Sequence, residues 1–311
     1  MANGGPQPPD STDVLIRTVC IKVHRYCDLA CSHCWTESSP RATDALTSNL
    51  ILSFAASMRE LGLTHVSLSG GEPLLFPDLQ TALQGLWRLG LIVTITTNGF
   101  NRKMLDKALR FVGSQGLPNT RFRVSIDGSP IHHEHIRGPG TYAPALEAVG
   151  NIRRTFNWVG VNTMVNKSVL PGVERLCADL VNAQVDHWAF ITEAPRGNLA
   201  GSTTSSDETF AAIEELEKIA RGKGYEGAIE KWNYLTAPHT YLLVEPDGRI
   251  LIPGTTEDED ILLGNVAGPN LTLIGAALKE LVARNAVTFF RWEHDRYFGR
   301  PSADGFRKQS E

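Results

Sequence analysis

The chain has 311 residues, of which 42% are hydrophobic and 21% charged, and its formal net charge is −4. These values are ordinary for a globular protein, and the length allows one large α/β domain, with or without an appendage. The basic residues are scattered, which argues against a nucleic acid polymer as partner, and no stretch resembles a signal peptide or a spanning helix, which argues against a membrane. Five cysteines, three of them clustered, are unlike a secreted disulfide framework and indicate a reducing cytoplasm.

From residue 14 to residue 192, short β-branched segments alternate with longer amphipathic segments. Strands are predicted at 14–23, 65–69, 91–96, 121–126, 160–165 and 187–192. Helices are predicted at 47–61, 78–89, 101–112, 144–155 and 171–183, with a polar start at Thr47 and an N-cap at Asp78. A strand followed by a helix, repeated about six times, predicts parallel strands with helical crossovers. The expected fold class is therefore α/β, as a partial (β/α)6 TIM barrel.

After residue 195 the pattern changes. A loop rich in Gly, Ser and Thr precedes a predicted helix at 207–221, and a turn sequence at 245–248 predicts a hairpin across 241–252. A last helix is predicted at 271–282. We therefore expect a disordered N-terminus at 1–13, a barrel core at 14–195, and a small C-terminal α+β appendage at 196–311 that covers the barrel.

Three closely spaced cysteines follow the first predicted strand. Cys27, Cys31 and Cys34 have the spacing C-x3-C-x2-C. Three thiolates can bind three irons of a [4Fe–4S] cluster and leave the fourth iron open to another ligand. A structural zinc site is the alternative, with His33 or Cys20 as the fourth ligand, but zinc sites usually have a second close pair of Cys or His, and none follows.

Short polar motifs end the next three strands. They are Gly70-Gly71-Glu72-Pro73, Thr97-Asn98-Gly99 and Ser125-Ile-Asp127-Gly128, the last followed by Arg137. The two glycines permit a close backbone approach, and Glu72 could accept from an ammonium group. Ser125 and Arg137 could bind a carboxylate. Each motif alone is also a common turn or surface loop, and the intervening His132, His133 and His135 are expected to be solvated loop residues and not ligands.

Because the strand ends of a (β/α) barrel lie on one face, the cysteine loop, Gly70–Pro73, Asn98, Asp127 and Glu193 should converge. The motifs, in this order, resemble the radical SAM superfamily over about residues 16–195. The cysteine motif, Ser125-Ile-Asp127-Gly128 and Gly140-Thr-Tyr142 are most similar to the subgroup related to SPASM/twitch-domain and haem-d1 or molybdopterin-cofactor enzymes.

The resemblance implies one [4Fe–4S] cluster on Cys27, Cys31 and Cys34, with S-adenosylmethionine chelated at the open iron. One electron then cleaves the S–C5′ bond, and the resulting 5′-deoxyadenosyl radical abstracts hydrogen from a substrate. An electron donor such as flavodoxin or ferredoxin is implied as a partner. For the cofactor, the resemblance places Gly70, Gly71 and Glu72 at the methionyl amino group, Asn98 near the ribose, Ser125 and Arg137 at the carboxylate, and Trp35, Asn162 and Val165 toward the adenine.

The C-terminal part departs from that subgroup. Its hairpin ends Pro253-Gly254 where such hairpins often end Pro-Cys, and no cysteine follows Cys177. The resemblance therefore implies a degenerate SPASM/twitch-like appendage without an auxiliary cluster. Cys177, within an amphipathic helix, and Cys20, within the first strand, are both expected to be buried.

A single cluster and a reduced appendage favour a small-molecule substrate of sugar or nucleoside type, in natural-product (antibiotic) or cofactor biosynthesis. Decarboxylation of a sugar acid by a lyase similar to cytosylglucuronate decarboxylases is one concrete candidate, and dehydration, epimerisation and alcohol oxidation are as compatible. Glu193 could act as general acid or base, and Arg196 could anchor an anionic substrate, although both could be surface charges. Two alternatives stay open: a radical SAM enzyme that modifies a ribosomal peptide, for which no extra recognition domain is evident, and a non-catalytic metal-binding protein.

Overall fold

The computed structural model describes residues 16–116, 119–156, 158–166, 169–202, 206–235 and 241–283. The predictions for residues 1–13 and for the region beyond 283 lie outside the described residues. One sheet has the strand order β10-β9-β8-β1-β2-β3-β4-β5-β6-β7. The strands are β1 (Thr18–Lys22), β2 (His65–Ser69), β3 (Ile92–Thr97), β4 (Thr120–Ser125), β5 (Gly160–Val165), β6 (His187–Thr192), β7 (Ala228–Trp232), β8 (Leu242–Val244), β9 (Arg249–Ile252) and β10 (Ile261–Asn265).

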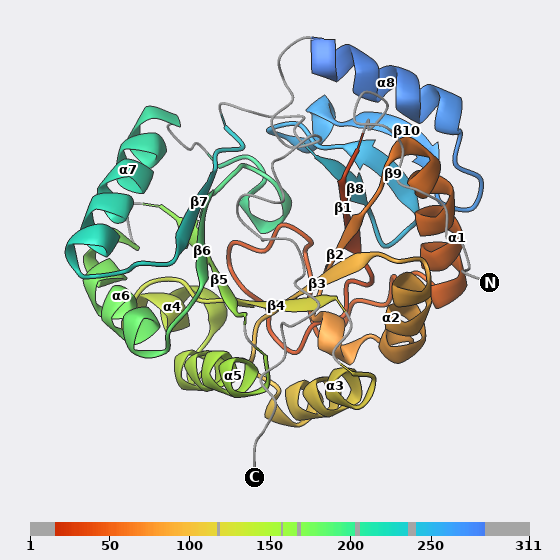
Figure 1. Ribbon diagram of the computed structural model, residues 1–311. Helices are drawn as coiled ribbons and strands as arrows, with labels where there is room; N and C mark the ends of the chain where they lie inside the picture. The colour runs from red at the N-terminus through yellow and green to blue at the C-terminus, as the bar shows by residue number, and fades with distance from the viewer. Residues whose placement is uncertain are drawn as a thin grey trace.

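Strands β1 to β7 pair in parallel, each with the next. The sheet curves into a partial barrel, and the helices lie around its outside (Figure 1). The helices are α1 (Ser48–Met58), α2 (Leu79–Arg88), α3 (Arg102–Ser114), α4 (Pro130–Arg137), α5 (Tyr142–Thr155), α6 (Val173–Asn182), α7 (Ser206–Gly222) and α8 (Leu271–Ala283). The α/β partial-barrel prediction is confirmed, and among the described strands the sheet stays open between β7 and β10.

Local sequence signals explain where the helices begin. The Thr47 hydroxyl accepts a hydrogen bond from the Leu50 backbone N–H at 3.3 Å, as an N-cap does. Asn101 caps α3 in the same way through the Met104 N–H at 3.2 Å. Asp78 stands at the N-cap position of α2, but its carboxylate accepts from the Ser48 N–H at 3.2 Å and therefore joins the starts of α1 and α2.

Helix α4 corrects the expectation of a histidine-bearing loop. A signal for this helix was present, because Ser129 precedes Pro130, and proline is favoured at the first position of a helix. His133 is fully buried, and its Nδ1 accepts from the Asp127 backbone N–H at 3.1 Å. His133 is therefore a packed residue that supports the end of β4, and not a solvated one.

Residues after 195 contribute strands to both edges of the sheet. β7, which the sequence analysis did not predict, pairs with β6, and β8 pairs in parallel with β1. The predicted hairpin is present as β8 and β9, and β10 follows antiparallel to β9. The domain boundary near residue 195 stays a prediction. No described helix is both long and apolar enough to span a bilayer.

The two faces of the strands differ in chemistry. Outward-facing residues such as Val19, Ile21 and Leu68 pack under the helices in the main hydrophobic core. Inward-facing residues of the same strands, such as Cys20 and Ser67, line a cavity. A complete TIM barrel usually fills its interior with bulky branched side chains. Here polar side chains and Cys20 take those positions on β1 and β2, most of them small, and the interior is hollow.

Candidate active site

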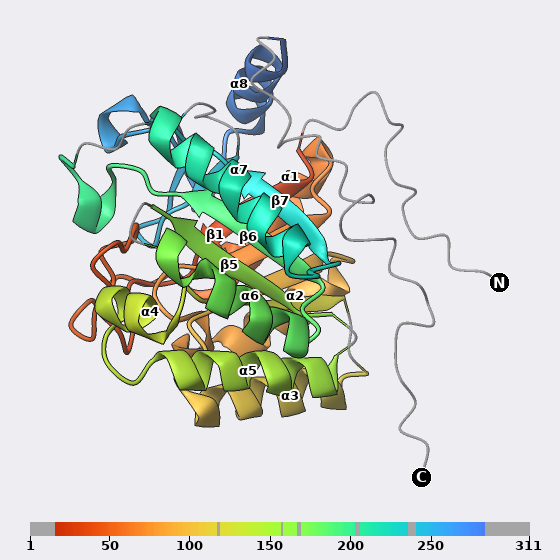
Figure 2. The ribbon, with the colours of Figure 1, turned by 90° about the vertical axis from the view of Figure 1, so that its left-hand side faces the viewer.

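The loop after β1 carries the three cysteines across the carboxyl ends of the strands, beside α4 (Figure 2). Cys27 and Cys31 are buried, Cys34 is half-buried, and all three thiols are free. The Leu29 N–H points to Cys27 Sγ at 3.4 Å, and the Ser38 N–H points to Cys34 Sγ at 3.4 Å. Hydrogen bonds of this kind stabilise negative charge on sulfur and tune iron–sulfur clusters.

Burial disfavours the thiolate form of two of these cysteines. It raises the pKa of Cys27 to about 12 and also raises the pKa of Cys31. Metal coordination is what deprotonates such groups. Within the described residues, no three Cys, His, Asp or Glu side chains converge on one metal-ion position. In a [4Fe–4S] cluster, by contrast, each thiolate binds a different iron, and the donor set of three thiols in one loop fits that group.

Gly70 and Gly71 form a seam with the backbone of the cysteine loop. The Gly71 N–H donates to His24 O at 2.7 Å, and the Glu72 N–H donates to Tyr26 O at 2.9 Å. A Cβ on Gly71 would lie 1.9 Å from Tyr26 O, and a Cβ on Gly70 would lie 2.5 Å from His24 O. The close approach predicted for these glycines is therefore made, at least in part, to the cysteine loop itself.

We expect Gly71→Ala to lower the iron bound after anaerobic reconstitution to less than about half of the wild-type value, because backbone atoms must move to admit the new Cβ. Iron per chain and the cluster absorption band would measure this. Gly222→Ala is the matched control, since nothing lies within 4 Å of a Cβ at that position. If Gly71→Ala binds as much iron as the wild-type protein, the close packing of Gly71 against the cysteine loop is not needed for cluster binding.

Glu72 ties the end of β2 to the end of β3. Its carboxylate accepts from the Thr97 hydroxyl at 2.7 Å, the Asn98 N–H at 2.8 Å and the Leu74 N–H at 3.1 Å. Burial raises its pKa to about 7 against these hydrogen bonds. The carboxylate is thus already engaged by the chain and does not line the cavity, whereas Gly70 and Gly71 do. Asn98 donates to Asp28 Oδ1 at 2.9 Å and approaches Cys27 Sγ at 3.7 Å.

Asp127 joins the cysteine loop to β5 and α4. It is fully buried, and its carboxylate accepts from His33 Nε2 at 3.0 Å, Arg137 Nε at 2.5 Å and the Met164 N–H at 2.8 Å. Burial opposes ionisation, but Arg137 and His33 hold the pKa of Asp127 well below its usual range. The ring of His33 is thereby directed to Asp127. The Ser32 N–H also donates to Ile136 O on α4 at 3.0 Å.

The loop after β6 holds the other side of the cysteine loop. Asn198 donates from its backbone to Cys34 O at 3.0 Å and from its side chain to Cys31 O at 2.8 Å. Arg196 is buried, and its two terminal nitrogens bind the Asp260 carboxylate at 2.7 and 2.8 Å. It also donates to the carbonyls of Gly254 and Thr256. These contacts fix the segment after β9, and they leave Arg196 outside the cavity lining.

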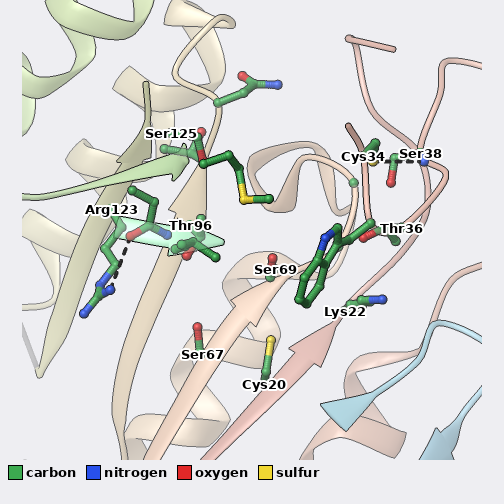
Figure 3. Close-up of a pocket in the computed structure, with 18 of the residues that line it drawn as sticks. Cys20, Lys22, Cys34, Thr36, Ser38, Ser67, Ser69, Thr96, Arg123 and Ser125 are labelled. Atoms are coloured by element: carbon green, nitrogen blue, oxygen red, sulfur yellow. Dashed lines mark hydrogen bonds between the residues drawn. The ribbon is translucent and has the colours of Figure 1, made fainter. Parts of the chain in front are cut away.

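A cavity of about 280 Å³ opens inside the barrel below the cysteines. Figure 3 shows the side chains of Cys20, Ser67, Ser69 and Thr96 around this space, from neighbouring strands. An aromatic group forms another part of the wall. Its members are Trp35, Trp232, Tyr234 and Tyr241, with ring centroids 4.7 Å apart for Trp35 and Tyr234 and 5.5 Å apart for Tyr234 and Tyr241.

Most of the predicted site residues meet at this cavity. The lining includes Cys27, Cys31, Cys34, Trp35, Gly70, Gly71, Asn98, Ser125, Arg137 and Asn162. Val165 does not join them, because it is fully buried on the helix-facing side of β5 and packs in the main core, while Met164 faces the cavity. Glu193 also lies outside the lining; its carboxylate accepts from Asn166 at 2.6 Å, and burial raises its pKa.

The sequence analysis missed the residues of the barrel interior. They include Lys22, Ser67, Ser69, Thr94, Thr96, Arg123, Trp232, Tyr234 and Tyr241, and Cys20, which was expected to be buried, is half-exposed to the cavity. A signal was present in the strands: Thr18-Val-Cys20-Ile-Lys22 and His65-Val-Ser67-Leu-Ser69 alternate polar and apolar residues. Strands of a parallel sheet covered on both faces usually read as continuous apolar segments. The alternation therefore indicated a polar interior.

Comparison with known protein families decides between the metal-site alternatives. Residues 21–177 match the model of the Radical SAM superfamily. The chain belongs to the radical SAM superfamily. It is thus an enzyme of a family that uses a [4Fe–4S] cluster and S-adenosylmethionine, which fits the three free thiols of the loop and the cavity beside them.

Curated relatives in this superfamily have varied activities. The chain is 29% identical over 188 residues to an AdoMet-dependent heme synthase of Methanosarcina barkeri, covering 58% of this chain and 52% of the relative. It is 24% identical over 274 residues to the sporulation killing factor maturation protein SkfB of Bacillus subtilis, covering 82% and 63%. The chain thus spans between about half and two thirds of the length of these relatives.

Solved structures of proteins with bound S-adenosylmethionine share the fold. Streptococcus suis SuiB bound to S-adenosylmethionine aligns with a TM-score of 0.63 at 13% identity, covering 76% of this chain and 60% of that one. Native anSMEcpe with bound AdoMet aligns with a TM-score of 0.64 at 14% identity, covering 83% and 79%. At these identities the likeness extends to the fold, and the partial barrel is the common element.

Proposed function

We propose that this radical SAM enzyme abstracts hydrogen from a small polar substrate of sugar or nucleoside type bound in the barrel interior. The bound cofactors supply the reducing electron and the 5′-deoxyadenosyl radical. The chain supplies three cysteines for the cluster, a cysteine loop held by Asp127 and Asn198, and a cavity inside the barrel beside that loop. An electron donor such as flavodoxin or ferredoxin, in a reducing cytoplasm, belongs to the same proposal.

The two-sided wall of the cavity is the observation that carries this proposal. Hydroxyls of Ser67, Ser69 and Thr96 line one part, and these groups both donate and accept hydrogen bonds, as sugar hydroxyls require. The aromatic group lines another part and offers ring faces for stacking on a sugar or a base. A flat or ring-shaped molecule with many hydroxyls matches both parts, whereas an apolar substrate would leave the hydroxyls unpaired.

Within this proposal, the cofactor lies toward the cysteines, where Gly70, Gly71, Asn98, Ser125 and Arg137 are candidate contacts, with Trp35 and Asn162 on the adenine side. Glu193, predicted from the sequence as a general acid or base, lies outside the cavity lining and accepts from Asn166, so that role requires a substrate that reaches beyond the lining. The geometry of Arg196 favours a structural role over the predicted role as a substrate anchor. Radical decarboxylation of a sugar acid, in natural-product or cofactor biosynthesis, is the reaction subtype that we favour.

Deuterium transfer tests the proposal. Reconstituted protein would be incubated anaerobically with S-adenosylmethionine, dithionite and perdeuterated sugar acids or nucleosides, and 5′-deoxyadenosine would be analysed by mass spectrometry. We expect deuterium in 5′-deoxyadenosine from at least one member of this class. Deuterium from a peptide panel, with none from the sugars and nucleosides, would overturn the substrate class.

A peptide substrate is the second candidate. One observation favours it: the relative that matches 82% of this chain is the sporulation killing factor maturation protein SkfB. One solved structure of SuiB also contains the precursor peptide SuiA. The peptide panel in the same deuterium experiment separates this candidate from the first.

A further inference from the structure

The cavity wall is cationic, and its counter-charges lie behind it. Every Lys or Arg side chain among the described lining residues is paired with a carboxylate, and no Asp or Glu is among those residues. The pairs are Lys22–Glu245 at 2.7 Å, Arg123–Glu230 at 3.1 Å and Arg137–Asp127 at 2.5 Å. A ligand in this space therefore meets three positive side chains among neutral polar and apolar groups, and no carboxylate of the described lining residues.

These three cations lie at different depths. Arg137 and the Cys31 thiol influence each other electrostatically, which places Arg137 beside the cysteine loop and the cofactor. Arg123 lies between the rings of Trp158 and Trp232, 6.0 and 5.5 Å from their centroids, and binds Asn162 and Glu230. Lys22 is on β1 across the hydroxyl-lined wall from Arg123 (Figure 3).

The ammonium group of Lys22 has unused binding capacity. The residue is only 7% exposed, and an ammonium group carries three N–H donors. Among the described residues, one acceptor is present for it, Oε1 of Glu245, which directly follows β8. A buried cation with unpaired donors is costly unless a ligand or water supplies acceptors. Glu245 is itself held by Arg25, at 3.6 Å, so the carboxylate can fix Lys22 in place.

We propose that Lys22 binds an anionic group of the substrate, a carboxylate or a phosphate, and that Glu245 positions its ammonium for this task. The inference rests on the proposal that a small polar substrate binds in the barrel interior, and it narrows that substrate to an acid or a phosphate ester. Ser69, the residue paired with Lys22 across β1 and β2, brings a hydroxyl to the same region and would hydrogen-bond the same anion.

Binding of three matched sugars tests this inference without turnover. D-Glucuronate, glucose 6-phosphate and glucose are titrated by calorimetry into reconstituted protein saturated with S-adenosylmethionine. We expect at least one of the two anionic sugars to bind about tenfold or more tightly than glucose, as a charge-assisted hydrogen bond allows. The stronger of the two identifies carboxylate or phosphate as the source of the charge. Equal affinity of all three sugars, or no detectable binding of any, overturns the proposal.

Variants test whether Lys22 causes the preference for anionic sugars. Lys22→Met is expected to abolish the anion preference, and Lys22→Arg to keep most of it. Because Lys22→Met strands Glu245, the double variant Lys22→Met/Glu245→Gln serves as a second version that removes both charges. Lys231→Met is the matched control, since Lys231 pairs with Glu214 and Glu217 outside the cavity. An anion preference that survives both Lys22 variants overturns the proposal.

The affinity for S-adenosylmethionine provides an internal check. If Lys22→Met weakens S-adenosylmethionine binding as much as sugar binding, the ammonium serves the cofactor carboxylate, and the proposal is wrong. Failure of this inference is distinguishable from failure of the proposed function, because deuterium transfer from a neutral sugar or nucleoside would leave the proposed function intact.

Discussion

Replacing Cys27 by Ala is expected to remove nearly all cluster absorption from the reconstituted protein, whereas replacing Cys177 by Ala should leave it unchanged. Both substitutions delete a single sulfur from a buried cysteine. Cys27 lines the cavity and receives hydrogen bonds from Leu29 and Asn98, while Cys177 packs within α6 near Ala220 O, at 3.7 Å. The loss of one of three thiolate ligands should therefore separate the two variants.

Iron per chain, the visible spectrum and the EPR signal after dithionite reduction would measure the difference. We expect Cys177→Ala to cost about 1 kcal/mol of unfolding free energy, as the loss of a small buried group does. The two variants thus distinguish a ligand from a core residue of the same type. Equal iron content in the two variants would contradict the cluster assignment.

Asp127→Asn is expected to lower the free energy of unfolding by about 3–5 kcal/mol at neutral pH, because it leaves the buried Arg137 without its counter-charge. The Asp127 side chain is fully buried, and that of Arg137 is 10% exposed. The exposed pair Arg102–Glu147 gives a control, and Glu147→Gln should change stability by about 1 kcal/mol or less. Denaturant unfolding of the protein before reconstitution would compare the variants.

The stability that Asp127 contributes is expected to decrease at low pH. The pKa of Asp127 in the folded chain lies well below its usual range, because Arg137 and His33 outweigh the effect of burial. Its contribution is therefore complete above the unfolded pKa of about 4 and is lost as the pH falls below that value. Wild-type protein should lose more stability than Asp127→Asn between pH 5 and about pH 3. If the free energy of unfolding of the two proteins falls equally over this pH range, the ionised Asp127 carboxylate does not stabilise the fold.

The sequence was sufficient to predict the barrel and the convergence of most strand-end motifs on one cavity. The regular alternation of strands and helices predicted the fold. The order of the motifs at the strand ends predicted that Cys27, Gly71, Asn98 and Ser125 lie close together, and all four line one cavity. This works because parallel strands place their carboxyl ends on one face, so that chain order alone predicts proximity. Asp127 was likewise expected at this face.

The other features of the site could not be predicted, because they depend on the direction of side chains and on partners far away in the sequence. Val165 and Met164 are neighbours in sequence, and only the pleat decides that Met164 faces the cavity. Arg196 was predicted as an anion anchor or a surface charge, because its partner Asp260 lies 64 positions away. β7 was missed because Ala228–Trp232 mixes charged and apolar residues, and its Glu230 is buried with Arg123 on β4 and His187 on β6 as ion-pair partners.

One measurement tests the central claim most directly: the formation of 5′-deoxyadenosine from S-adenosylmethionine by the anaerobically reconstituted chain. With dithionite present, we expect 5′-deoxyadenosine in wild-type protein and in Cys177→Ala, and none above background in Cys27→Ala. A cluster-loaded wild-type protein that binds S-adenosylmethionine but yields no 5′-deoxyadenosine, with or without sugar and nucleoside substrates, would contradict the account.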